Sequence, residues 1–160
     1  MIKLKKITEN NLNECVALNP GEANSRFVET NVRSLAIAYV NKDNDVCIPM
    51  PYAIYKDEIM IGFIMMSFLG KDQDNDVEED SYDIWRFMID QKYQGNGYGR
   101  EALLKAIELV KTFPNGPANQ LILSCIADNK VGNRLYKSVG FKPNGNAYED
   151  QIEMSLELIL

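Results

Sequence analysis

Gln94-Gly95-Asn96-Gly97-Tyr98-Gly99-Arg100 is the stretch that decides how the rest of this chain is interpreted. It lies between an apolar segment with strand character, residues 82–90, and a segment with apolar residues at helical spacing, residues 103–110. The first turn of a helix carries unpaired backbone N–H groups and a partial positive charge. Glycine lets such a backbone approach a ligand closely and take a positive φ. The stretch therefore predicts an anion site suited to a pyrophosphate.

Other interpretations of the glycine stretch are weaker. Gly97-x-Gly99-x-x-Ala102 matches the dinucleotide fingerprint formally, and Asp128 follows after the next predicted strand. However, the stretch begins at residue 94 and only about one further βα unit follows it, so a complete doubly wound sheet does not fit. A Walker loop is excluded because no Gly-Lys-Ser/Thr follows. A glycine-rich turn without a ligand stays open as the structural alternative.

The remaining patterns predict a mixed α/β domain over residues 1–160, with helices packed on a central sheet. The segment from Ile61 to Phe68 is apolar at successive positions, which predicts a central strand buried on both faces. Pro49 and Pro51 are expected to break the chain before the strand that begins at Tyr52. Strands are predicted at residues 2–7, 52–56, 59–69, 82–90, 120–126, from 141 onward and at 151–158, and helices at 10–18, 32–40, 103–110 and 131–139.

Composition limits the possible functions. The 160 residues are 46% hydrophobic and 25% charged, as expected of one folded domain. No apolar run approaches the roughly 20 residues that span a bilayer, and the N-terminus does not resemble a signal peptide. We therefore expect a cytoplasmic protein without a membrane partner. The net charge of -6 disfavours a nucleic-acid partner.

Histidine and cysteine usage excludes several chemistries. The chain has no histidine, which excludes Ser-His and Cys-His nucleophilic mechanisms and histidine-based metal sites. It has three cysteines, Cys15, Cys47 and Cys125, and no CxxC pair. This odd count suggests neither a disulfide framework nor a zinc site. No metal is expected.

Several motifs together resemble the GNAT N-acetyltransferases. Gln94-x-x-Gly97-x-Gly99 resembles the acyl-CoA loop of that family, and residues 57–63 resemble its central hairpin. Residues 82–89 resemble the strand that pairs with pantetheine, and the motif from Asn129 to Phe141 resembles the C-terminal helix. The resemblance covers most of residues 52–141. It implies a single GNAT-like domain with a mostly antiparallel twisted sheet of about six or seven strands, flanked by about four helices.

The resemblance also implies a reaction, the transfer of an acetyl group from acetyl-CoA to a primary amine by direct attack in a ternary complex. Residues 86–90 leading into residues 93–95, together with residues 27–29, are similar to the bacterial spermine/spermidine acetyltransferases. A small cationic amine such as spermidine or spermine is therefore the first expected acceptor. A peptide N-terminus, an amino acid or an aminoglycoside stays open. A small NAD-dependent oxidoreductase and an acyl-CoA-binding sensor without catalysis are the rivals from other classes. A homodimer is a further family-level expectation.

The resemblance assigns residues to the cofactor. The backbone of Phe87, Met88 and Ile89 would pair with pantetheine as an added strand. The diphosphate would be held by Gln94, Gly95, Asn96, Gly97, Tyr98, Gly99 and Arg100, although Arg100 could equally be a solvated helix residue. Asn129 and Asn133 would lie beside the cofactor, and Asn129 also suits a helix N-cap.

The resemblance also points to catalytic and acceptor-binding residues. Tyr136 matches the family tyrosine that protonates the departing thiolate, and a core tyrosine is its alternative. Trp85 stands where polyamine acetyltransferases tend to place a carboxylate, and Asp83, one strand period earlier, is the candidate base. A solvated residue at the strand edge is the alternative for Asp83.

Acceptor-binding candidates are Glu29, Trp85, Glu79 and Asp80, and the acidic run from Asp72 to Asp80 would steer a cation or be simply solvated.

Overall fold

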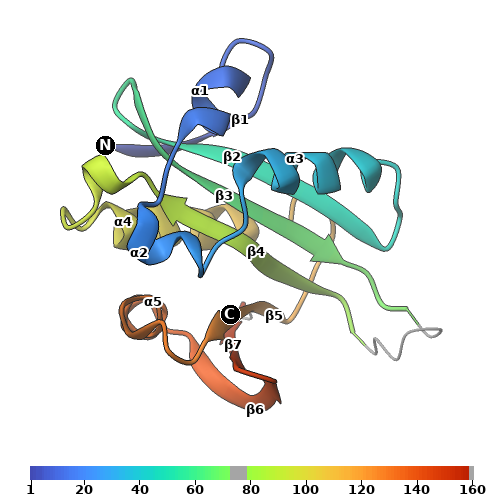
Figure 1. Cartoon of the computed structure of the whole chain (residues 1–160). Helices are drawn as coiled ribbons and strands as arrows, with labels where there is room; N and C mark the ends of the chain where they lie inside the picture. The colour runs from blue at the N-terminus through green and yellow to red at the C-terminus, as the bar shows by residue number, and fades with distance from the viewer. Residues whose placement is uncertain (73–78, 159–160) are drawn as a thin grey trace.

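A computed structural model describes residues 1–72 and 79–158 (Figure 1). In chain order the elements are β1 (Ile2–Lys6), α1 (Leu12–Ala17), α2 (Glu22–Ser25), α3 (Asn31–Val40), β2 (Cys47–Lys56), β3 (Ile59–Leu69), β4 (Ser81–Ile89), the 3-10 helix η2 (Gln91–Tyr93), α4 (Tyr98–Val110), β5 (Gln120–Ile126), α5 (Lys130–Ser138), β6 (Lys142–Tyr148) and β7 (Gln151–Glu157). No helix in these two ranges is both long and apolar enough to cross a membrane.

The strands form one seven-stranded sheet in the order β1-β2-β3-β4-β5-β7-β6. Every neighbouring pair is antiparallel except β4 and β5, which are parallel. The prediction of a mixed α/β fold with a mostly antiparallel sheet is confirmed. The predicted helices are all present. The 3-10 helix η2 was not predicted, and neither was the short helix α2. It has four residues, which is too short for a helical period to appear in the sequence.

Two apolar clusters lie on opposite faces of the sheet. The α4 face of the sheet packs residues such as Ile64 and Met66 against Leu103 of α4. The α3 face packs Phe63 and Met65 against residues of α1 and α3. In Figure 1, α3 accordingly lies in front of the strands, α1 lies above them, and α4 lies behind. Strand β3 is buried from its second to its tenth residue, so the prediction of a central strand apolar on both faces is confirmed.

The expectation that Pro49 and Pro51 break the chain is wrong, because both lie inside β2. They pair with Ser67 and Met65 of β3, whereas β1 covers β2 only from Tyr52 onward. This half of β2 is therefore an edge of the sheet. In a strand, the N–H groups of residues two apart point to the same side. Two prolines spaced by two residues therefore leave the hydrogen bonds to β3 intact when both of their missing N–H groups would have faced the open edge.

Strands β4 and β5 separate part-way along their length, and this separation creates the space for a site. Their pairing ends at Ile84 and Leu123. At the same place the register between β3 and β4 shifts, so that Trp85 has no partner on β3. Such a bulge bends a strand and increases its local twist. In Figure 1, the C-terminal part of β4 runs away from β5, β7 and α5. Beyond Ile84, β4 thus has an open edge.

Candidate active site

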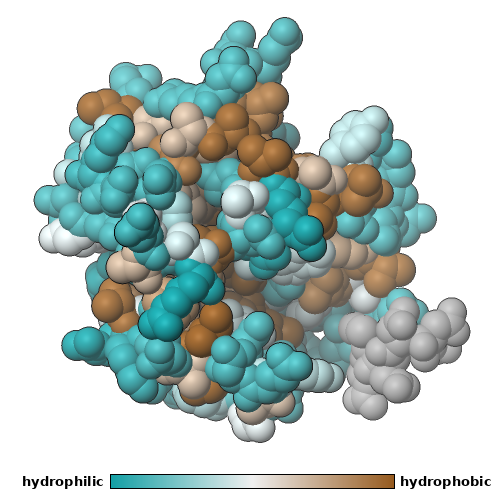
Figure 2. Space-filling model, viewed as in Figure 1, coloured by the Kyte–Doolittle hydropathy of each residue, from teal (hydrophilic) through white to brown (hydrophobic). Residues whose placement is uncertain are grey.

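Two cavities meet at the separation of β4 and β5. The first, the loop cavity, has a volume of about 450 Å³ and is lined by β4, the glycine loop and α5. The second, the sheet cavity, has a volume of about 410 Å³ and is lined by β4, β5 and β7. Phe27, Asn129 and Tyr136 line both. In Figure 2 the surface is hollowed between an upper and a lower body, and apolar side chains are visible at its floor.

The glycine loop presents unpaired backbone donors to the loop cavity. Gly95 and Gly97 have φ angles of 77° and 79°, which only glycine adopts without strain. Gly97 is also the N-cap of α4. Within the described residues, no atom lies within 4 Å of a Cβ built on either glycine, and no acceptor pairs with the N–H groups of residues 95–99. Such a helix N-terminus favours an anion.

Gly99 has a different role from the two glycines before it. A Cβ at this position would lie 3.4 Å from the Leu135 side chain of α5 and 3.8 Å from the Phe87 ring. Both distances are ordinary van der Waals contacts, so Gly99 lies where α4 meets α5 and β4, and a methyl group would fit there.

The side chains of Gln94 and Asn96 fix the shape of the loop, and Gln94 also lines the loop cavity. Nε2 of Gln94 donates to the carbonyl oxygens of Ile89 and Pro20 at 2.8 and 2.9 Å. Nδ2 of Asn96 donates to the carbonyl oxygens of Tyr93 and Gln94. An anion in this loop would therefore meet backbone N–H groups and the exposed Arg100, which also lines the loop cavity.

The open edge of β4 continues from the loop toward the sheet cavity. Phe87, Met88 and Ile89 line the loop cavity, and among the described residues no strand pairs with them on the side of β5. An extended ligand can add to such an edge through main-chain hydrogen bonds. The predicted cofactor residues of β4 and of the loop are thus brought together along one wall.

Tyr136 stands where the two cavities join. Its ring packs against those of Phe87 and Phe141, with centroids 6.5 and 6.3 Å apart. Burial, and to a lesser extent the nearby Cys125, raises the pKa of the Tyr136 phenol above its ordinary value. The phenol is therefore protonated at neutral pH and can serve as a proton donor.

Asp83 lies in the sheet cavity, on the α3 face of β4. Its Oδ1 accepts a hydrogen bond of 2.7 Å from Ser67 Oγ. Burial raises the pKa of this carboxyl group from 3.8 to about 7, while hydrogen bonds from Ser67 and Trp85 and the charge of Arg86 oppose that rise. A carboxyl group that titrates near neutrality is suited to accept a proton.

The sequence model of the acetyltransferase (GNAT) family matches residues 20–141, which hold the loop, the open edge and Tyr136. The chain belongs to the acetyltransferase (GNAT) family. It is an acetyl-CoA-dependent N-acetyltransferase, with acetyl-CoA as co-substrate.

Relatives of this GNAT protein include polyamine acetyltransferases. The spermine/spermidine N(1)-acetyltransferase of Bacillus subtilis (strain 168) is 26% identical over 145 residues, which are 90% of each chain. The crystal structure of spermidine N-acetyltransferase from Vibrio cholerae, in complex with CoA and spermine, has a TM-score of 0.72 at 16% identity and covers 98% of this chain and 95% of that one. PaiA N-acetyltransferase from Thermoplasma acidophilum, in complex with coenzyme A, has a TM-score of 0.68 at 15% identity and covers 98% of this chain and 99% of that one.

The sheet cavity of this GNAT protein has a polar wall, on which Asp83 is accompanied by a second carboxylate that the sequence did not indicate. Pairing of Asp83 with Ile122, and of Ser124 with Glu153, places these side chains on one face. Glu153 Oε1 accepts hydrogen bonds from the side-chain amides of Asn144 and Asn146, at 2.6 and 2.8 Å. Two carboxylates therefore lie on the same wall, about 12 Å apart between Cα atoms by strand geometry.

Sequence reasoning missed Glu153, Arg86 and Phe27 as cavity residues. Glu153 alternates with apolar residues in β7, and Arg86 stands in a continuous strand pattern. Neither pattern differs from that of an ordinary strand, so periodicity held no signal for them. Arg86 and Phe27 appeared only within the segments that resemble polyamine acetyltransferases.

Several predicted site residues lie outside both cavities. Glu29 is paired with Arg33 at 3.2 Å, Glu79 accepts a hydrogen bond from Asn119, and Asp80 accepts one from the backbone of Lys71. Their roles in acceptor binding stay predictions. Of the acidic run, residues 73–78 lie outside the described residues.

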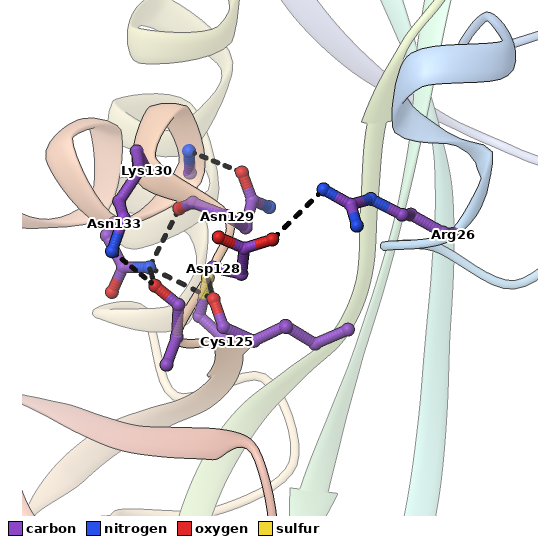
Figure 3. Close-up of polar contacts among 9 residues, drawn as sticks. Arg26, Cys125, Asp128, Asn129, Lys130 and Asn133 are labelled. Atoms are coloured by element: carbon purple, nitrogen blue, oxygen red, sulfur yellow. Dashed lines mark hydrogen bonds and ion pairs between the residues drawn. The ribbon is translucent and has the colours of Figure 1, made fainter.

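Asn129 and Asn133 organise the turn between β5 and α5 (Figure 3). Asn129 Oδ1 accepts from the Gly132 N–H at 2.9 Å, so the N-cap interpretation is confirmed, and the residue also lines both cavities. Nδ2 of Asn133 donates to the carbonyl oxygens of Asn129 and Ile126 at 2.7 and 3.1 Å. Asn133 lines neither cavity, and its role toward the cofactor stays a prediction.

An ion pair joins the segment that follows α2 to the turn between β5 and α5, beside the junction of the cavities. Arg26 Nη2 lies 3.1 Å from Asp128 Oδ2, as Figure 3 shows. Each partner precedes a residue that lines both cavities, Phe27 and Asn129 respectively. The pair is exposed, so it contributes little to stability by itself.

Neither a metal nor a thiol intermediate is indicated for this GNAT protein. In residues 1–72 and 79–158, no group of three or more His, Cys, Asp or Glu side chains could hold a metal ion. Burial raises the pKa of the Cys125 thiol to about 11, which disfavours the nucleophilic thiolate. The thiol nearest the junction is therefore unsuited to carry an acyl group.

Proposed function

We propose that this N-acetyltransferase acts on a primary amine of a small cationic molecule, with a polyamine such as spermidine or spermine as the first candidate. The polyamine acetyltransferases among its relatives support this acceptor class. So do the two carboxylates on the wall of the sheet cavity, because a molecule with several ammonium groups can contact both. The single observation that carries the proposal is that this cavity joins the loop cavity at Tyr136.

The two cavities suggest how the substrates are arranged. The diphosphate of acetyl-CoA would lie on the backbone N–H groups of residues 95–99, with pantetheine along the open edge of β4. The acetyl group would then lie at the junction, and the amine would approach from the sheet cavity. This arrangement supports direct attack in a ternary complex.

Proton transfer is the chemical task left to the side chains. At pH 7 only about one lysine-like amine in 10³ is neutral, so a proton acceptor accelerates the reaction. Asp83, with a pKa near 7, would take the amine proton, directly or through one water. The amine nitrogen then bonds to the carbonyl carbon, and the carbon–sulfur bond breaks. The thiolate leaves with the electron pair and takes a proton from Tyr136.

An amine panel tests the proposed function. The purified protein is incubated with acetyl-CoA and spermidine, spermine or a simple monoamine, and free CoA thiol is measured. Release that depends on the amine is expected, with spermidine or spermine preferred. Tyr136→Phe with the same amines serves as the control for background hydrolysis. Absence of amine-dependent release with every acceptor would contradict the proposal.

The compartment and the assembly state are also proposals. The described cysteines are all free thiols, which suits a reducing compartment, so we place the reaction in the cytoplasm. A homodimer stays a prediction from the family, and light scattering of the purified protein tests it.

A further inference from the structure

Arg86 carries a buried hydrogen-bond donor that the fold does not use. Its side chain lines the sheet cavity, on the α3 face of β4. Nη1 donates to the carbonyl oxygen of Trp85 at 2.9 Å. Nε is shielded from solvent, and within residues 1–72 and 79–158 it has no acceptor. It is the single buried side-chain nitrogen or oxygen in that part of the chain without a partner.

An unpaired buried donor is costly, and a charged one more so. Guanidinium nitrogens only donate, so the missing partner must be an oxygen of a ligand or a water. Nε and Nη2 form one edge of the planar group, and the described residues provide no acceptor for either of them. That edge matches the two oxygens of a carboxylate. Because the Arg86 side chain lines the sheet cavity, from which the amine would approach, a ligand that meets this edge would be the acceptor rather than CoA.

The position of Arg86 relative to Asp83 fits a molecule that carries both charges. Asp83 pairs with Ser67 and Arg86 with Met65, so the two residues lie on the same face, one strand period apart along β3. Their Cα atoms are therefore about 7 Å apart. An amine near Asp83 and a carboxylate near Arg86 can belong to the same small molecule.

We propose that Arg86 binds a carboxylate of the acyl acceptor, so that the acceptors of this enzyme include amino acids. The inference rests on the proposed acetyl transfer to an amine and extends the acceptor class beyond polyamines, which lack any oxygen. Turning the Nε edge into the cavity requires rotation of the Arg86 side chain. The rotation breaks one protein hydrogen bond, from Nη1 to Trp85, and the carboxylate replaces it with two.

Two pairs of acceptors isolate the carboxylate. Lysine differs from cadaverine, and ornithine from putrescine, only by the carboxylate. The ratio of kcat/KM within each pair is measured from free CoA thiol, with spermidine as a further acceptor. For the wild type we expect the carboxylate to raise kcat/KM roughly ten- to hundredfold, the effect of a charged hydrogen-bonded pair.

Variants assign the effect to Arg86. In Arg86→Gln the lysine-to-cadaverine ratio should fall by roughly tenfold or more, because the charge is lost. Arg86→Lys keeps the charge but loses the bidentate pair of donors, so its lysine-to-cadaverine ratio should be intermediate. If Arg86→Gln does not fold, Arg86→Lys takes its place in the test. Arg134→Gln, on the exposed side of α5, should keep the wild-type ratio. Binding of acetyl-CoA, measured by calorimetry, reports that each variant is folded.

The outcomes separate this inference from the proposed function. If cadaverine or spermidine is acetylated and the amino acids are not, or if Arg86→Gln keeps the wild-type ratio, the inference is overturned and acetyl transfer to amines stands. If none of the five amines is acetylated, both are overturned.

Discussion

Replacing Asp83 by Asn tests whether the titrating group of the sheet cavity is the base. The carboxyl group binds its proton more tightly in the folded protein than in the unfolded chain, because burial raises its pKa from 3.8 to about 7. Its contribution to the free energy of unfolding is therefore greatest at low pH. It declines as the pH rises through this interval and stays constant above about pH 7. Asn has no proton to lose, so the variant should not show this decline.

The size of the effect follows from the pKa interval. A change from 3.8 to about 7 corresponds to at most about 4 kcal/mol. Asp83 is partly exposed, so solvent screens its charge and we expect about 2 kcal/mol. Relative to the wild type, the variant should gain this amount of unfolding free energy between about pH 4 and about pH 8. Urea unfolding at several pH values measures it.

The same group should appear in the kinetics. The wild-type kcat/KM should rise with pH and level off above about pH 7, which gives the pH profile an acidic limb. Asp83→Asn should lower kcat/KM about a hundredfold and remove this limb. Ser67→Ala removes a hydrogen bond that lowers the pKa of Asp83, so the limb should move to higher pH. Parallel stability curves for wild type and variant, or a rate limb that persists in Asp83→Asn, would refute the reasoning.

Three further predictions concern the cofactor side of the junction. Tyr136→Phe should lower kcat about a hundredfold with acetyl-CoA affinity nearly unchanged, because the phenol donates a proton only during the reaction. Steady-state kinetics measures both, and a variant kcat equal to that of the wild type would exclude Tyr136 as the proton donor. Gly97→Ala should weaken CoA binding at least about tenfold in calorimetry, because the new methyl group occupies the space of the diphosphate. Gly145→Ala, at a φ of 95° with no described atom within 4 Å, is its control for backbone strain, and equal CoA affinities of the two variants would contradict the loop assignment. Arg26→Ala or Asp128→Ala should reduce CoA affinity less than about fivefold, with the difference vanishing at high salt; a larger loss that persists in salt would show a direct contact.

The parts of the fold that depend on local patterns could be predicted from the sequence. Alternation and apolar runs predicted the strands. The glycines between strand and helix predicted the turn with positive φ angles that opens α4, because this backbone requirement is local. Tyr136 and the β4 residues were predicted only through the family resemblance. Their meeting along one wall required the structure.

Only part of the acceptor side could be predicted. Asp83 and Trp85, named from the sequence, both line the sheet cavity, whereas the other residues of its wall depend on register between distant segments. Glu153 enters the wall through its pairing with Ser124, and Arg86 takes its position at a bulge that leaves Trp85 unpaired. No periodicity encodes which strand pairs with which. The role of Gln94 was likewise hidden, since its amide bonds to residues of two separate segments.

The two prolines of β2 also bear on how copies of the protein meet at high concentration. An uncovered strand edge offers a row of donors and acceptors to a strand of another molecule. At Pro49 and Pro51 the donors are missing, so a second sheet cannot continue this one there. Association of copies by joining their sheets must then avoid this half of β2, which protects a concentrated solution from one route to aggregation.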